Sequence, residues 1–179
     1  MDWDERLFAY LDDLEQDAET RFDAERAGEL SDRARAEYAA VTLASRLMAS
    51  VDRPVVLEVR GAGVVSGVLE RVGGDWCLVA AGAREWVVRL AHVVTVAGTS
   101  ERSVPEVAWS PVARLGIGSA LRGLADAGAR CLVHTADGAS YDVVIGRVGA
   151  DFVEVVTGQD RTLLVALPCI AAVAVAVGG

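Results

Sequence analysis

The chain has 179 residues, of which 53% are hydrophobic, so it has enough apolar side chains for a buried core and is not a disordered tail. Its formal net charge is −9, and residues 1–52 hold 14 of the 26 acidic residues but only 6 of the 17 basic ones, all arginines. Proteins that bind the phosphates of nucleic acids usually present a basic surface, so this acidic charge balance disfavours general nucleic-acid binding.

Cysteine usage and the apolar C-terminal run predict a cytoplasmic protein without a membrane span. Cys77, Cys131 and Cys169 are odd in number and form no CxxC pair, which is typical of a reduced compartment. The acidic start, MDWDERLFAY, lacks the positive charge of a signal peptide. The uncharged run Leu163–Gly179 has only 17 residues and is interrupted by Pro168, whereas a membrane-spanning helix needs about 20 apolar residues.

Residues 1–52 predict an acidic helical segment. Apolar side chains recur at helical spacing among the acids before Gly28 and again over Leu30–Ser50, where a helix is expected. Two helices, or one long helix bent near Gly28, both fit this pattern. The narrow first stripe either packs onto the protein's own core or is a partner-binding face. The candidate interaction face consists of Leu7, Leu11, Leu14 and Phe22.

From Pro54 onward the pattern changes to short valine-rich runs separated by glycine or charged residues, which is typical of strands. Residues 53–98 contain five strand candidates, and residues 129–179 contain five more. Residues 99–128 predict a linker followed by a short helix over Ile117–Gly128. The predicted class is therefore α+β, mainly β.

The two β units repeat each other at an offset of 76 residues. RVGGDWCLVA (71–80) corresponds to RVGADFVEVV (147–156), and the register continues with one inserted residue. A glycine suits a sharp bend, an aspartate accepts N–H groups in the same turn, and an aromatic residue starts the next strand. We interpret this pattern as structural rather than catalytic. The repeat signature consists of Gly73, Asp75, Trp76, Gly149, Asp151 and Phe152.

A helix, five short strands, a bent second strand and VGxD at the third strand together resemble the Sm-like (LSm) small-barrel fold. TADGASYDVVIGRVGADFVEVV is similar to the first Sm motif, and LLVALPCIAAV lies where the short second motif is expected. The resemblance covers residues 31–97 and 117–177. It implies an N-terminal helical segment followed by two tandem five-stranded Sm-like barrels, each preceded by a helix. The layout, with RLGIGSALR between the copies, also resembles an uncharacterised family of actinobacterial proteins.

The chain departs from RNA-binding Sm proteins at the residues that read RNA. Those proteins carry an asparagine four residues after the third-strand aspartate, where this chain has Val79 and Val155. They also carry an Arg-Gly or Lys-Gly pair in the second motif, where this chain reads LAHV and LPCI. The groups that recognise single-stranded RNA are therefore missing from both copies.

No residue is predicted to be catalytic, to bind a cofactor or to hold a metal. His92 and His134 fall on different strand candidates of different repeats, and neither recurs in the other copy. Cys131 and His134 are three residues apart, which on a strand places them on opposite faces and prevents a shared metal. Each histidine is expected to be solvated.

Two functional hypotheses follow. The first is a non-enzymatic cytoplasmic scaffold or adaptor, which binds a protein partner or a second copy through its acidic N-terminal helix and its barrel edges. The alternative is an Sm-like nucleic-acid-binding regulator of RNA or DNA, which requires seven arginines to gather on one face. These are Arg60, Arg71, Arg84, Arg89, Arg130, Arg147 and Arg161. A small-ligand pocket between the barrels has no support in the sequence.

Overall fold

The computed structural model describes Leu14, Gln16, Arg21, Phe22, Arg26, Gly28, Glu29 and residues 31–176. The chain divides into two compact units, Met1–Val41 and Thr42–Gly179, which we describe separately. In the first unit, residues 31–39 are helical and exposed. Arg33 Nε lies 3.4 Å from Glu37 Oε1 one helical turn away, an exposed ion pair of the kind that adds little stability.

The helix expected over Leu30–Ser50 is interrupted at Val41 and Thr42. A new helix, α2 (Leu43–Met48), begins in the second unit with a capping box. The Ser45 N–H donates to Thr42 Oγ1 at 3.1 Å, and the Thr42 N–H donates to Ser45 Oγ at 3.0 Å. The prediction of one continuous helix is wrong at this point, because these side chains satisfy N–H groups that a helix start leaves without partners.

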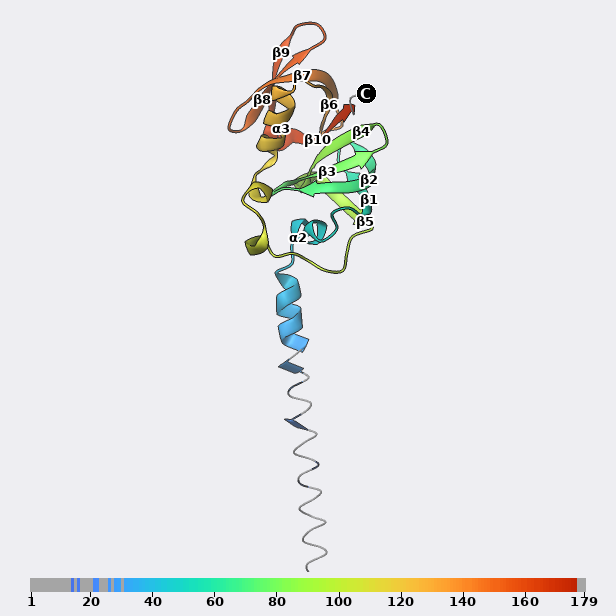
Figure 1. Cartoon of the computed structure of the whole chain (residues 1–179), viewed down its shortest axis with the longest axis vertical. Helices are drawn as coiled ribbons and strands as arrows, with labels where there is room; N and C mark the ends of the chain where they lie inside the picture. The colour runs from blue at the N-terminus through green and yellow to red at the C-terminus, as the bar shows by residue number, and fades with distance from the viewer. Residues whose placement is uncertain are drawn as a thin grey trace, which may run out of the picture. The chain divides into compact units, whose positions relative to one another are not determined.

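The second unit is built on one antiparallel sheet. Among the described residues this sheet has ten strands, in the order β5-β1-β2-β3-β4-β10-β6-β7-β8-β9 (Figure 1). It is open, with β5 and β9 at its edges. The strands are β1 (Pro54–Val59), β2 (Gly63–Val72), β3 (Trp76–Ala81), β4 (Arg84–Arg89), β5 (Val93–Ala97), β6 (Arg130–Thr135), β7 (Ser140–Val148), β8 (Phe152–Thr157), β9 (Thr162–Ala166) and β10 (Ile170–Ala176).

The prediction of two closed five-stranded Sm-like barrels, each preceded by a helix, is wrong. β10 pairs with β6 on one side and with β4 on the other, so both halves of the chain belong to one continuous sheet. An unpaired edge strand exposes a row of N–H and C=O groups. By pairing, β4 and β10 supply hydrogen-bond partners for each other's N–H and C=O groups. We call this pairing, Arg84–Val88 with Ala172–Ala176, the joint. The Sm-like resemblance is not retained.

The two halves of the sheet follow the same path. The first runs in the order β5-β1-β2-β3-β4, and the second runs in the equivalent order β10-β6-β7-β8-β9. A short 3₁₀ turn precedes the last strand of each half, η1 (Leu90–His92) and η4 (Leu167–Cys169). The β2–β3 register shifts after Leu69, and the β7–β8 register shifts after Ile145, 76 positions later. The sequence repeat therefore corresponds to a repeated arrangement of strands.

Each half completes its core with side chains from the other. Trp76 and Val87 of the first half belong to the cluster of buried apolar residues that fills the second half. Ala171 and Ala172 of β10 belong to the cluster that fills the first half. Burial of apolar surface is the main stabilising term in folding, so this exchange favours cooperative folding of the two halves as one domain.

The helix predicted over Ile117–Gly128 is confirmed as α3 (Ile117–Asp126). It packs against β7 (Figure 1), and the side chain of Leu121 is fully buried. Gly128 follows it with a φ of +58°, a left-handed conformation that favours glycine at the end of a helix. The linker before α3 contains two 3₁₀ turns, η2 (Glu106–Ala108) and η3 (Val112–Arg114).

The uncharged C-terminal run forms β9, η4 and β10 in its described part. The N–H and C=O groups of such strands are paired in the sheet rather than within a helix. Across the part of the chain that the structure describes, no helix is both long enough and apolar enough to cross a membrane.

Candidate interaction surface

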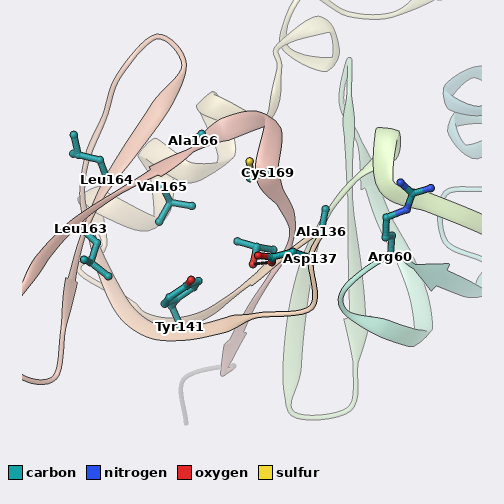
Figure 2. A pocket seen from close by; sticks show the side chains of 10 residues that line it. Arg60, Ala136, Asp137, Tyr141, Leu163, Leu164, Val165, Ala166 and Cys169 are labelled. Carbon is teal, nitrogen blue, oxygen red and sulfur yellow. Dashed lines mark hydrogen bonds between the residues drawn. The ribbon is translucent and has the colours of Figure 1, made fainter.

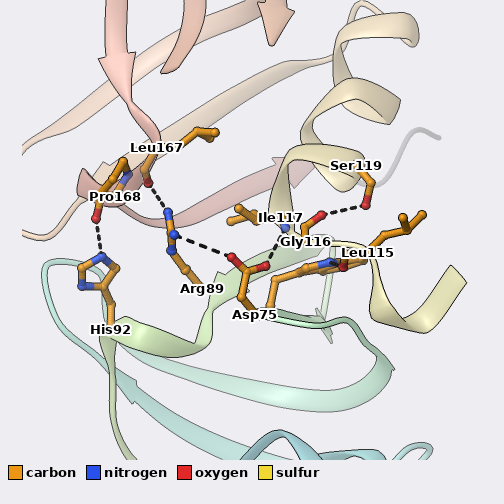
Figure 3. A network of polar contacts seen from close by, with 10 residues as sticks. Asp75, Arg89, His92, Leu115, Gly116, Ile117, Ser119, Leu167 and Pro168 are labelled. Atoms are coloured by element: carbon orange, nitrogen blue, oxygen red, sulfur yellow. Dashed lines mark hydrogen bonds and ion pairs between the residues drawn. The ribbon is translucent and has the colours of Figure 1, made fainter. Parts of the chain in front are cut away.

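The joint is reinforced by side chains of the first half that bind carbonyl groups of the second (Figure 3). The Arg89 guanidinium, at the end of β4, donates a hydrogen bond to the Leu167 carbonyl oxygen. His92 Nε2, in η1, lies 2.8 Å from the Pro168 carbonyl oxygen. Both acceptors belong to the 3₁₀ turn η4, so these bonds hold that turn against the first half.

Asp75 links the joint to helix α3 (Figure 3). Its Oδ1 accepts the Ile117 N–H at 2.6 Å, and its Oδ2 lies 3.6 Å from Arg89 Nη2. The N-cap residue of α3 is Gly116, which has no side chain to accept this N–H. Asp75 therefore supplies the negative charge that a helix N-terminus favours. The bond differs from the predicted one within the same turn, because the acceptor lies in another segment of the chain.

The glycines of the repeat signature leave room for the aromatic ring that follows each of them. A Cβ on Gly73 would lie 2.1 Å from Trp76 Nε1, and one on Gly149 would lie 2.6 Å from Phe152 Cε1. Trp76 is 8% exposed, and its Nε1 donates to the Leu115 carbonyl at 3.0 Å, whereas Phe152 is 37% exposed. The two turns have the same arrangement of glycine and aromatic ring, but only the ring of the first turn, Trp76, is buried.

His134, on β6, lies beside the joint, opposite Ala172. Its ring stacks on Trp86 of β4 across the intervening β10, with ring centroids 5.3 Å apart. Ala172 and Ala174 of β10 pair with His134 and Trp86, and these small side chains leave room for the rings. Burial, and secondarily the charge of Arg84, lower the His134 pKa from its ordinary 6.5. The prediction of a solvated histidine is therefore wrong for His134, whose Nε2 is buried without a hydrogen-bond partner.

The edge strand β9 is the counterpart of β4, but among the described residues it has a neighbouring strand, β8, on one side only. Its ladder to β8 is bonded at Arg161 and at Leu167, which flank the strand. Because bonded and non-bonded positions alternate in an antiparallel ladder, Leu164 directs its backbone N–H and C=O away from β8. The Leu164 side chain is 65% exposed, whereas Val87 at the equivalent position of β4 is 4% exposed. The edge is therefore open in both its backbone and its side chains.

A groove of about 590 Å³ follows this edge (Figure 2), and we call it the β9 groove. Leu163, Leu164 and Val165 form its apolar wall, and Tyr141 and Arg60 approach it from other elements. In Figure 2, Leu163, Val165 and Tyr141 lie on one side of the hollow and Arg60 on its far side, whereas the Leu164 side chain points away from them. Such a groove fits apolar side chains of an extended segment lying along β9.

Asp137 is the acidic group of the β9 groove, and its carboxylate is already bound within its own hairpin. It accepts the Thr135 hydroxyl at 2.5 Å and the Ala139 N–H at 3.2 Å. These bonds lower the pKa of the Asp137 carboxyl, chiefly the one from Thr135. Asp137 therefore holds the β6–β7 turn in shape, and Gly138 completes that turn with a φ of +92°.

Three of the seven arginines that the nucleic-acid hypothesis requires are paired with carboxylates. Arg89 Nη2 lies 3.6 Å from Asp75 Oδ2. Arg130 makes two bonds to Asp142, at 2.7 and 2.9 Å. Arg147 Nη2 lies 3.1 Å from both carboxylate oxygens of Glu154. Pairing of this kind reduces the positive potential available to a phosphate backbone.

The predicted interaction face lies partly outside the described residues. Leu7 and Leu11 are not among them, whereas Leu14 and Phe22 are helical and are 47% and 62% exposed. The guanidinium carbon of Arg26 lies 5.6 Å from the centre of the Phe22 ring. The use of this face in binding stays a prediction.

Groups with reactive chemistry are dispersed or buried. The described residues contain no cluster of three or more histidine, cysteine, aspartate or glutamate side chains suited to a metal ion. Burial raises the pKa of Cys77 to about 12 and that of Cys131 to about 11, so both thiols stay protonated. Cys169 is exposed at the β9 groove.

Sequence reasoning named barrel edges as contacts but did not single out β9, although the sequence carried a signal for it. β4 reads REWVVR and is paired in the joint, whereas the equivalent run, RTLLVA (161–166), keeps a charge only at Arg161, just before β9, and has none within the strand itself. Natural edge strands are commonly protected by charged residues or proline, so an uncharged edge indicates a strand that is covered by something else.

No protein-family model matches the chain, and no curated protein matches it significantly. The resemblance to an uncharacterised actinobacterial family therefore has no support and is not retained.

Proposed function

We propose that the protein is a non-enzymatic cytoplasmic scaffold that binds another protein by accepting one of its strands at β9. The observation that carries this proposal is the state of Leu164, which lies on an open sheet edge with an exposed side chain and outward backbone groups. In strand addition, main-chain hydrogen bonds provide affinity and adjoining side-chain pockets provide specificity. β9 offers those bonds, and the β9 groove offers a pocket.

Charge supports a protein partner over a nucleic acid. The net charge is −9, and three of the candidate phosphate-binding arginines are paired with carboxylates. The acidic N-terminal segment, with its face of Leu7, Leu11, Leu14 and Phe22, is proposed as a second contact that favours a basic partner surface.

A photo-crosslinking amino acid at position 164 tests the proposal in cells. We expect crosslinks to protein at this position, and few at position 64, because Val64 is comparably exposed (68%) but lies on β2 within the sheet. Leu164→Lys should abolish binding of the crosslinked partner, and Val64→Lys should leave it intact. Crosslinking at position 164 that does not exceed the position 64 control, or adducts that nuclease removes, would contradict the proposal.

A further inference from the structure

The strand that fits β9 is present in the chain itself. We propose that β9 of one molecule pairs with β5 of a second copy, so that chains join head to tail. This inference rests on the proposed function and names a partner for the same edge. The template is the joint, in which the fourth strand of one half pairs with the fifth strand of the other. β9 and β5 are the remaining fourth and fifth strands, and among the described residues each lacks a neighbouring strand on its outer side.

The repeat specifies the register of the contact between chains. In the joint, Val87 pairs with Val173. Residues of β9 and β10 lie 77 positions after their counterparts in β4 and β5, so the equivalent pair is Leu164 of one chain and Val96 of the next. Both have outward backbone groups, and for Leu164 this follows from its ladder with β8. For Val96 it follows from the bond of the Leu69 N–H to the Arg53 carbonyl, because alternation from there directs the partners of Thr95 and Ala97 in β1 toward β5.

Side chains that the joint buries have exposed apolar counterparts at the free edges. Val87 is 4% exposed and its counterpart Leu164 is 65% exposed. Ala171, which precedes the joint in β10, is fully buried, and its counterpart Val94 in β5 is 56% exposed. Grooves follow both edges, of about 590 Å³ beside β9 and about 250 Å³ beside β5. A second copy would bury both sets of side chains at once, as the joint does within the chain.

The contact between chains lacks the polar bonds of the joint. Ala166 and Cys169 of the β9 edge stand where Arg89 and His92 stand beside β4. Neither can donate the strong side-chain hydrogen bonds to backbone carbonyls that hold η4 in the joint. The assembly should therefore be weaker than the joint and should dissociate on dilution.

Two edge variants of the full-length chain test the pairing. Leu164→Lys places a charge on the β9 edge, and Val96→Lys places one on the β5 edge. We expect the wild type to show concentration-dependent association by sedimentation velocity, and each variant alone to be monomeric. Mixed together, the two variants should form a one-to-one dimer, because each supplies the edge that the other has lost. Val64→Lys is the matched control and should associate like the wild type.

Several results would overturn the inference. One is a wild type that stays monomeric at every concentration, and another is the absence of a dimer from the mixed variants while both remain folded by circular dichroism. Dimerisation of Val96→Lys alone would indicate β9–β9 pairing and would also overturn it. Loss of association in Val64→Lys would show that the edges are not the contact.

Disulfide trapping checks the register independently. Cys169 is first replaced by serine, and Leu164→Cys and Val96→Cys are placed on separate molecules. Residues of a directly opposed hydrogen-bonded pair lie about 5.5 Å apart between Cα atoms, a separation that a disulfide spans. We expect this pair to crosslink faster than Leu164→Cys with Thr99→Cys. If the chain is monomeric but position 164 still crosslinks to a different protein, this inference fails and the proposed function stands. If neither occurs, both fail.

Discussion

Trp86 and His134 stack across β10 with their ring centroids 5.3 Å apart, although they belong to different halves of the sheet. Neither ring recurs in the repeat, since Leu163 stands at the position of Trp86 and Glu58 at that of His134. The stack therefore forms only where the two halves meet, and has no equivalent elsewhere in the repeat. The pKa of His134 is accordingly a measure of whether β4, β10 and β6 are paired.

Acidification below the ordinary histidine pKa of 6.5 should destabilise the sheet. The folded-state pKa of His134 is lowered, so the unfolded chain takes up the proton first. The contribution of neutral His134 is complete above pH 6.5 and is lost as the pH falls from there through the folded-state pKa. Urea unfolding at a series of pH values measures this loss. His134→Phe keeps a ring on Trp86 but cannot titrate, so its free energy of unfolding should fall less with decreasing pH than that of the wild type. If both proteins show the same dependence on pH, the loss of stability does not come from His134.

Asp75 and Asp151 are equivalent in sequence and differ in their contacts, which makes them a matched pair. Asp75→Ala removes the acceptor for the Ile117 N–H and the partner of Arg89, and should destabilise the protein by about 1–2 kcal/mol. The Asp151 side chain is exposed and none of the hydrogen bonds of the described residues involves its carboxylate, so Asp151→Ala should cost less than about 0.5 kcal/mol. Chemical denaturation of both variants tests this, and equal losses would show that the bond to α3 contributes nothing.

Gly73 and Gly149 allow a similar comparison. A methyl group at Gly73 meets the ring of Trp76, which is buried and held by its bond to Leu115, so Gly73→Ala should cost about 1–3 kcal/mol. At Gly149 the obstructing ring is Phe152, which is more exposed and has room to turn, so Gly149→Ala should cost less. Thermal unfolding ranks the two variants. If Gly149→Ala were the more destabilising variant, burial of Trp76 and its bond to Leu115 would not be what restrains the ring.

Local features of the fold could be predicted from the sequence because their causes are local. The valine-rich runs predicted strands, and the glycine–aspartate–aromatic signature predicted the bends, since both patterns act within a few residues. The end of α3 at Gly128 followed in the same way, whereas Asp75, which accepts the Ile117 N–H at the start of α3, lies in another segment of the chain. The capping box at Thr42 was equally local, and the prediction overlooked it.

The arrangement of the strands into one sheet could not be predicted in this way. Two small barrels and one open sheet use the same strands and turns, and they differ in the pairing of the end strands of each half. Closed barrels would pair β4 with β5 and β9 with β10, whereas in the sheet β4 pairs with β10. The side chains that decide this pairing include Arg89 and His92, and their partners are backbone carbonyls. Any residue can provide a carbonyl group, so no pattern in the sequence marks Leu167 or Pro168 as the acceptor. The candidate site at β9 could not be predicted for the same reason. β9 is an edge strand because β10 pairs with β4 and β6 and not with β9.

The acidic N-terminal segment is proposed as a second contact, and its deletion separates that role from the sheet. Residues 1–28 carry ten acidic and three basic side chains. Their removal should leave urea unfolding of the sheet unchanged, because the described core clusters draw only on residues from Leu47 onward. The deletion should lower partner crosslinking at position 164. If charge drives the contact, the crosslinking yield of the otherwise wild-type chain should also fall with added salt.

Two full-length variants separate charge from apolar contact in this segment. One replaces its aspartates and glutamates by asparagine and glutamine, and the other replaces Leu7, Leu11, Leu14 and Phe22 by serine. If the face binds through its apolar stripe, the serine variant should lose crosslinking and the neutralised variant should keep most of it, because exposed charges separated by more than about 8 Å at physiological salt are largely screened. Undiminished crosslinking in the deletion and in both variants would remove the segment from the proposed function and leave β9 as the contact that must account for binding.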